Sequence, residues 1–203
     1  MPIEDSNTSS YSLINDIDTY ANTALVNKGT GQNYGLEFTL ECFFNRGFYY
    51  MSTLSIYNSF YTAGDGIERS TAYNGNYIFN MIGGKEFAYR KSGKDKVFFV
   101  NTKISLLGGT PYTPIDLVAS QNMETTVFED SPYSLSGDDV FFANLSFGTR
   151  KNKRNTTREF KIDFNNATNN SAVIRTYYNQ ATEEIEKSTQ LPMIPNIVYT
   201  IKF

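Results

Sequence analysis

Apolar and aromatic side chains recur at every second position in long segments spread over the whole chain. The stretch 33–44 reads NYGLEFTLECFF, in which apolar and polar residues alternate from Leu36 onward. Successive side chains of a β-strand point to opposite faces of a sheet, so such a segment has one apolar and one polar face. The pattern predicts an all-β fold built from antiparallel strands.

Seven segments are predicted to be strands on this basis. They are residues 33–44, 48–61, 74–87, 97–107, 139–149, 157–164 and 196–203. Short turns are expected at 45–47, 90–95 and 150–155, and long polar connections at 62–72, 108–137 and 165–190. Residues 1–24 are expected to form a loop or irregular lead-in segment, followed by the strands within 25–203. Because strand direction alternates, the short turns fall at one end of the sheet and the long connections at the other.

Composition excludes several functional classes. The chain has 18 basic and 21 acidic residues and a net charge of −3, so it lacks the positive field that a nucleic-acid backbone requires. It has no histidine and a single cysteine, Cys42, which removes serine–histidine catalysis, histidine-containing zinc sites and internal disulfides. We therefore expect neither an enzyme nor a protein that holds a metal or cofactor, and no nucleic-acid partner.

Strand length and the sorting of the loops favour a membrane-spanning sheet. Globular strands commonly have about 5 to 6 residues, whereas strands of about 10 to 12 residues can cross a bilayer when tilted. Bacterial outer-membrane barrels also have short periplasmic turns and long extracellular loops. We interpret the chain as an antiparallel, up-and-down transmembrane β-barrel segment whose apolar face meets lipid. The charged residues expected to face the lumen are Glu37, Glu41, Lys103, Glu159 and Lys161.

Two other folds fit the same alternation. In a soluble antiparallel β-sandwich the apolar face would be the core, and the chain would be a carbohydrate-binding or other ligand-binding module. In a small closed barrel, residues 11–26 would supply an eighth strand, although INDIDTYANTA alternates poorly and would place two aspartates in lipid. The chain has no apolar run of 18 residues for a membrane helix, and residues 1–20 do not have the pattern of a signal peptide.

Five segments in order resemble a known family. They are LVNKGTGQNYGLEFTLECFF, AYNGNYIFNMIGGKEF, GGTPYTPIDL, EFKIDFNNATN and the terminal YTIKF. Together they are similar to the C-terminal β-barrel portion of TonB-dependent outer-membrane receptors of the Bacteroidota type, which often carry a carboxypeptidase-regulatory-like domain before the plug. The resemblance covers residues 25–203.

The resemblance implies a receptor that takes up nutrients across the outer membrane of a Gram-negative bacterium. Such receptors have about 22 strands around a plugged lumen, so about seven strands would be a C-terminal fragment that does not transport alone. Its partners would be outer-membrane lipid, the barrel-assembly machinery and the rest of the receptor, with its plug, through which it would reach TonB.

The resemblance also implies roles for particular residues. Tyr199, Ile201 and Phe203 would be the signal that the barrel-assembly machinery recognises; in the alternative interpretation, Phe203 fills a core. The loop 108–137 is the candidate ligand loop, with Tyr112 and Tyr133 as aromatic contacts.

Overall fold

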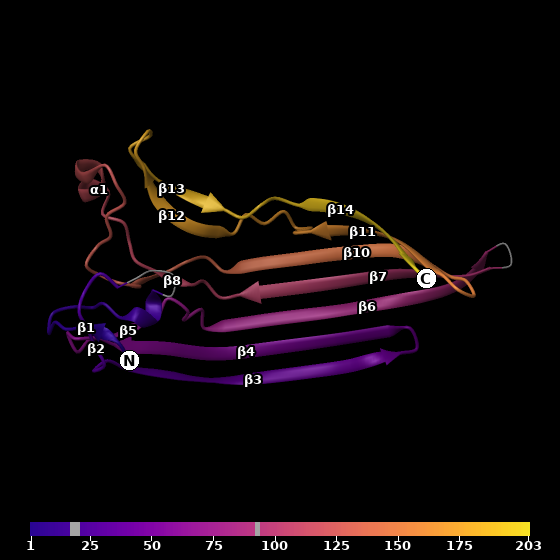
Figure 1. Cartoon of the computed structure of the whole chain (residues 1–203), viewed down its shortest axis with the longest axis horizontal. Helices are drawn as coiled ribbons and strands as arrows, with labels where there is room; N and C mark the ends of the chain where they lie inside the picture. Colours follow the sequence, from indigo (N-terminus) through magenta and orange to yellow (C-terminus); the bar gives the residue numbers. More distant parts are fainter. Residues whose placement is uncertain (17–20, 92–93) are drawn as a thin grey trace.

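Seven long strands form one antiparallel sheet in the computed structural model, which describes residues 1–16, 21–91 and 94–203 (Figure 1). The strands are β3 (Thr30–Asn45), β4 (Phe48–Thr62), β6 (Tyr77–Lys91), β7 (Lys94–Leu107), β10 (Val140–Asn152), β11 (Thr157–Asn165) and β14 (Ile194–Lys202). Their order in the sheet is β14-β11-β10-β7-β6-β4-β3, and the short strand β5 (Glu68–Ser70) pairs with β4. Sequential neighbours pair antiparallel throughout, which confirms the predicted all-β class with antiparallel strands.

The connections are sorted between the two ends of this sheet (Figure 1). At the turn end, β3 leads to β4, β6 to β7 and β10 to β11 through two to four residues. The remaining described segments, 1–16, 21–29, 63–76, 108–139 and 166–193, gather at the opposite end, which we call the loop end. Within the described residues the sheet does not close on itself, because β3 and β14 each have a neighbour on one side only.

Several strands extend further than the apolar alternation predicts. The turn expected at 90–95 is narrower, because Arg90 pairs with Asp95 and Lys91 with Lys94. The turn expected at 150–155 is also shorter, since β10 continues to Asn152. In both hairpins the backbone ladder runs past the last apolar residue, so the charged residues at these ends belong to strands.

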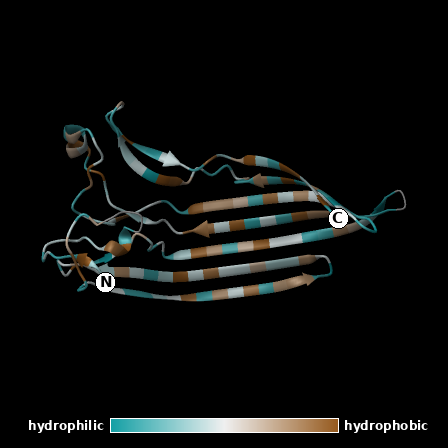
Figure 2. Ribbon diagram, viewed as in Figure 1, coloured by the Kyte–Doolittle hydropathy of each residue, from teal (hydrophilic) through white to brown (hydrophobic). Residues whose placement is uncertain are grey.

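The register places the regularly alternating apolar residues of all seven strands on one face, while some other apolar residues, such as Ile78 and Phe99, lie on the opposite face. Leu54, for example, lies opposite Phe38 of β3 and Phe79 of β6, and Phe79 lies opposite Leu106 of β7. We call this side the apolar face; it includes Leu36, Phe38, Leu40, Leu54, Ile56, Phe79, Met81, Val100, Ile104, Leu106, Phe141, Leu145, Phe147, Phe160, Ile162, Phe164, Ile197, Tyr199 and Ile201. Figure 2 shows the alternation of hydrophobic and hydrophilic residues along the strands. The residues between them form the polar face.

The apolar face is not covered by another layer of the described residues. Leu36 is 68% exposed and Ile197 72% exposed, although both lie within strands. The three remaining sheets have two strands each and are small. No second large sheet is present in the part of the chain that the structure describes, and the packing expected of a soluble β-sandwich is not seen there.

The loop end holds the small elements and the most buried side chains. The elements are β1 (Ile3–Glu4), η1 (Leu13–Asn15), β2 (Leu25–Val26), β8 (Pro111–Tyr112), α1 (Leu117–Met123), β9 (Leu135–Ser136), β12 (Val173–Asn179) and β13 (Glu184–Thr189). Ile3, Tyr61 and Ala63 form a buried cluster there. Strand β1 pairs with β2, so residues 11–16 and 21–26 do not supply a long eighth strand. No helix among the described residues has the length and apolarity needed to cross a membrane.

Candidate functional site at the loop end

Two adjoining cavities lie on the polar face where the strands enter the loop end. The first has a volume of about 700 Å³ and the second about 530 Å³. Both are lined by Thr110 and Tyr112, which come from the loop 108–139, and by Ile174, Arg175 and Thr176 of β12. The shared lining makes them two parts of one recess between the sheet and the β12–β13 hairpin.

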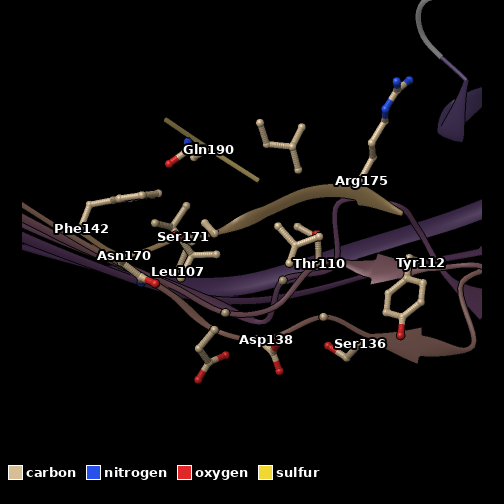
Figure 3. A pocket seen from close by; sticks show the side chains of 18 of the residues that line it. Leu107, Thr110, Tyr112, Ser136, Asp138, Phe142, Asn170, Ser171, Arg175 and Gln190 are labelled. Atoms are coloured by element: carbon tan, nitrogen blue, oxygen red, sulfur yellow. The ribbon is translucent and has the colours of Figure 1, made fainter. Parts of the chain in front are cut away.

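Strand ends form the floor of the first cavity. The lining residues contributed by the long strands are Tyr57, Ile78, Leu107, Val140 and Phe142. The walls come from the loop 108–139 and from residues 170–176 (Figure 3). The sequence positions these walls through the short β8–β9 ladder, in which Tyr112 pairs with Leu135. Gly109 permits this close approach, because a Cβ atom there would collide with the carbonyl oxygen of Gly137.

Some charged groups of the first cavity have hydrogen-bond or ion-pair partners among the described residues, and others do not. The Asp139 carboxylate accepts hydrogen bonds from the Tyr77 hydroxyl, at 2.7 Å, and from the backbone N–H of Gly109, at 3.1 Å. Arg175 has no carboxylate within ion-pair distance among the described residues; its guanidinium lies 5.4 Å from the centre of the Tyr177 ring. Lys187 also lines the first cavity and has no ion pair within the described residues. Arg175 and Lys187 are therefore the cationic groups of the recess that can pair with an anionic or hydroxyl-rich ligand.

Five aromatic rings line the second cavity, together with polar residues, two prolines and Ile174. The aromatic residues are Tyr11, Tyr61, Tyr112, Phe128 and Tyr133. The Tyr61 hydroxyl donates to the carbonyl of Ser10 at 3.2 Å, and the Tyr11 hydroxyl donates to Asp16 at 3.2 Å. The bond from Tyr61 ties the N-terminal segment to the end of β4, and the bond from Tyr11 lies within that segment. Rings with polar tips give a surface suited to flat or amphipathic ligands.

Tyr133 should link the stability of the loop end to alkaline pH. Burial raises the pKa of Tyr133 to about 12 from an ordinary value of 10.0. The folded state therefore holds this proton more tightly than the unfolded state, and the stability contributed is fully present below pH 10 and is lost as the pH rises through 12. The pKa of Tyr61, which lies in the buried cluster of the loop end, is also raised, chiefly by burial. We expect ultraviolet absorbance to detect late tyrosine ionisation to which Tyr133 contributes, with loosening of the loop end in the same pH range.

The matched variant for this titration is Tyr133→Phe, which keeps the ring and removes the ionisable group. The late-ionising signal should fall by the contribution of one tyrosine in this variant, and the alkaline loosening of the loop end should weaken. A late signal that persists unchanged in Tyr133→Phe would show that another tyrosine carries it.

The structure brings the two predicted ligand-loop residues together. Tyr112 and Tyr133 both line the second cavity, and Tyr112 also lines the first. The backbone of Tyr133 has a positive φ of 54°, which is uncommon for a bulky residue, and its N–H donates to the Thr113 hydroxyl at 3.2 Å.

The other predicted residues lie along the strands. The five expected to face the lumen share the polar face: Glu37, Glu41, Lys103, Glu159 and Lys161. They do not form one cluster; Lys161 pairs with Asp163 at 2.9 Å, and Glu159 lies 3.9 Å from Arg150. Tyr199 and Ile201 lie on the apolar face of β14, and Phe203 is 99% exposed, so it fills no core in this structure.

Sequence reasoning missed the β12–β13 hairpin and therefore the position of Arg175. Both strands lie in the stretch 165–190, which reads as a polar connection. The alternation in VIRTYYN, and its continuation in EIEKST, is the signal that could have found them. The helix α1 was also missed; Asp116 marks its start, because its carboxylate accepts a hydrogen bond from the N–H of Ala119.

Comparisons of the chain with models of known protein families, with curated proteins and with solved structures find no match. Among the described residues, no group of three or more histidine, cysteine or carboxylate side chains is arranged to hold a metal ion. The recess thus offers aromatic rings, backbone groups, two cations and several carboxylates as its binding chemistry; the charged residues are Arg175, Lys187, Asp16, Glu129, Asp138 and Asp139.

Proposed function

We propose that this chain forms the C-terminal strands of a TonB-dependent outer-membrane receptor of the Bacteroidota type. In this proposal it contributes to nutrient uptake across the outer membrane of a Gram-negative bacterium and does not transport alone. The observation that carries the proposal is the apolar face, which extends over all seven long strands and is not covered by protein within the described residues. Water is an unfavourable environment for such a surface, and lipid is a favourable one.

The dimensions of the strands support a membrane location. Strand β7 has 14 residues, which at roughly 3.3 Å per residue is about 46 Å long. Tilted by about 45°, it rises about 33 Å, close to the roughly 30 Å thickness of a bilayer core. Strand β11 has 9 residues, which is the shortest strand length expected to span a bilayer core.

The two open edges support a larger assembly. Strands β3 and β14 present unpaired backbone groups along one side, and such groups are not tolerated in lipid. We propose that the remaining strands of the receptor pair with both edges and that the plug fills the lumen on the polar face. The TonB-dependent identity comes from the sequence resemblance, with TonB and the barrel-assembly machinery as further partners.

The recess at the loop end is the proposed place of contact with the nutrient. In an outer-membrane barrel the long loops face the exterior, so Tyr112, Tyr133 and Arg175 would lie where a ligand arrives. Arg175 and the surrounding rings suit a ligand with hydroxyl or carboxylate groups on a flat body.

Fractionation of the host tests this proposal directly. An antibody against residues 165–190 should detect the protein in outer membranes after a carbonate wash, in a band several times larger than the 23.0 kDa of this chain. A membrane band at 23.0 kDa would contradict the large receptor and would indicate a small barrel or an assembly of several copies of this chain. A signal confined to the soluble fraction would reject a membrane location.

A further inference from the structure

Charge is strongly polarised along the strands. The described loop-end segments carry 14 acidic and 4 basic residues, and the long strands and short turns carry 6 acidic and 14 basic residues. The net charge of −3 is therefore the sum of −10 at the loop end, +8 on the strands and short turns, and −1 from Asp18, which lies outside the described residues. Much of the positive charge is concentrated near the turn end, where the short turns add Arg46, Lys153 and Arg154.

Six of the strand cations lie on the apolar face. We call them the basic belt: Lys85, Lys91, Lys94, Lys96, Lys151 and Arg158. Each lies close to one of the short turns, and Lys85 donates from Nζ to the carbonyl of Arg46 in the β3–β4 turn at 3.1 Å. No acidic residue occupies the apolar face of the seven strands. The belt therefore borders the apolar surface at its turn end and has one sign of charge.

The protein does not neutralise this belt. None of its six members lies within ion-pair distance of a carboxylate in the described residues. The carboxylates near the turn end are on the polar face instead; Glu86, for example, accepts from Arg150 at 2.7 Å. Acidic partners were therefore available in the same strands but are directed to the opposite face.

Two pairs of belt residues oppose each other directly across strands. Lys91 pairs with Lys94, and Lys151 pairs with Arg158. Like charges in opposed cross-strand positions are destabilising. An anion placed beside each pair would turn this repulsion into attraction, so the arrangement fits a negatively charged partner lying against the belt.

We infer that the basic belt binds the phosphate groups of anionic phospholipids, such as phosphatidylglycerol, in the leaflet at the turn end. This inference rests on the proposed membrane location. The apolar face beside the belt would contact the acyl chains, so a headgroup phosphate lies at the depth of the lysine and arginine side chains. The belt then fixes the depth of the turn end in the membrane and selects its lipid neighbours.

Flotation of the full chain with lipid vesicles tests the belt. The probes are vesicles of neutral phosphatidylcholine and vesicles of phosphatidylcholine mixed with phosphatidylglycerol. The belt variant carries Lys96→Gln, Lys151→Gln and Arg158→Gln, and the control carries the polar-face changes Lys103→Gln, Lys161→Gln and Lys202→Gln, so both lose three positive charges. We expect the preference of the parent chain for anionic vesicles to fall about a hundredfold in the belt variant and to survive in the control.

The other possible outcomes of the flotation experiment each contradict phospholipid binding by the basic belt. If both triple variants lose the preference for anionic vesicles equally, net charge alone is responsible for the preference, and phosphate binding by the basic belt is contradicted. Binding of the parent chain to neutral vesicles without an anionic preference would overturn the belt and leave the proposed function standing. Failure to bind either vesicle would contradict phospholipid binding by the belt, and the fractionation of host membranes would then decide the membrane location separately. The variant Lys96→Arg with Lys151→Arg keeps the charge and should keep the preference, which separates charge from folding defects.

Discussion

An arginine in place of Leu54 should keep the chain from inserting into membranes, whereas an arginine in place of Thr53 should have little effect. Leu54 lies on the apolar face of β4, flanked by Phe38 and Phe79 on the neighbouring strands. A charged side chain on the lipid face near the bilayer midplane costs about 2 to 4 kcal/mol. The inserted population should fall by roughly thirtyfold to a thousandfold, measured as protein that resists a carbonate wash of outer membranes.

Thr53 provides the matched control because it is the next residue of the same strand. It lies on the polar face, opposite Thr39 and Asn80. In a barrel its replacement would face a wet lumen, where an arginine is tolerated. If the two variants insert equally well, the apolar face does not contact lipid; if the parent and both variants remain in the aqueous fraction, the chain is a soluble protein.

The period of two predicts the strands well because it reports directly on the two faces of a sheet. The register confirms that the alternation starting at Leu36 belongs to one continuous apolar surface, shared with Leu54 and Phe79. The alternation predicts strand ends less well, because backbone pairing continues beyond the apolar band. The end of the β6–β7 ladder, where Lys91 pairs with Lys94, contains no apolar side chain from which the pairing could be predicted.

The β12–β13 hairpin was not predicted because much of its stabilisation is polar. The Glu186 carboxylate accepts hydrogen bonds from Asn179 at 2.7 Å, Thr182 at 2.9 Å and Tyr177 at 3.1 Å. The pKa of Glu186 is lowered, chiefly by the bonds from Thr182 and Asn179. Such a carboxylate has no signature in a hydropathy pattern.

The candidate site could be predicted only in part, for a related reason. Aromaticity in a long loop was sufficient to single out Tyr112 and Tyr133, and both line the recess. Arg175 and Tyr11 line the same recess from segments far apart in the sequence. Their convergence depends on how the loops pack over the strand ends, and no local pattern encodes that packing.

Truncation of Phe99 to alanine should produce a large loss of stability on the polar face. Phe99 is 4% exposed, although the sheet has one layer, because its ring lies over Gly148 of the neighbouring strand. Removing a buried phenylalanine ring costs about 3 to 5 kcal/mol. The control is Phe98→Ala, which removes an identical ring from the apolar face, where the ring is 37% exposed and lipid can replace its contacts. Denaturant unfolding from neutral vesicles should show a much smaller loss for Phe98→Ala.

The glycine beneath the ring makes the same contact testable from its other side. A Cβ atom at Gly148 would lie 2.7 Å from Cζ of Phe99 and would also meet the carbonyl oxygen of Phe160, so Gly148→Ala should displace the ring and cost about 1 to 3 kcal/mol. In the double variant Phe99→Ala with Gly148→Ala, the alanine methyl group at position 148 no longer collides with the Phe99 ring. The double variant should therefore lose less stability than the sum of the two single losses. Strict additivity would mean that ring and glycine act independently and that the burial of Phe99 has another cause.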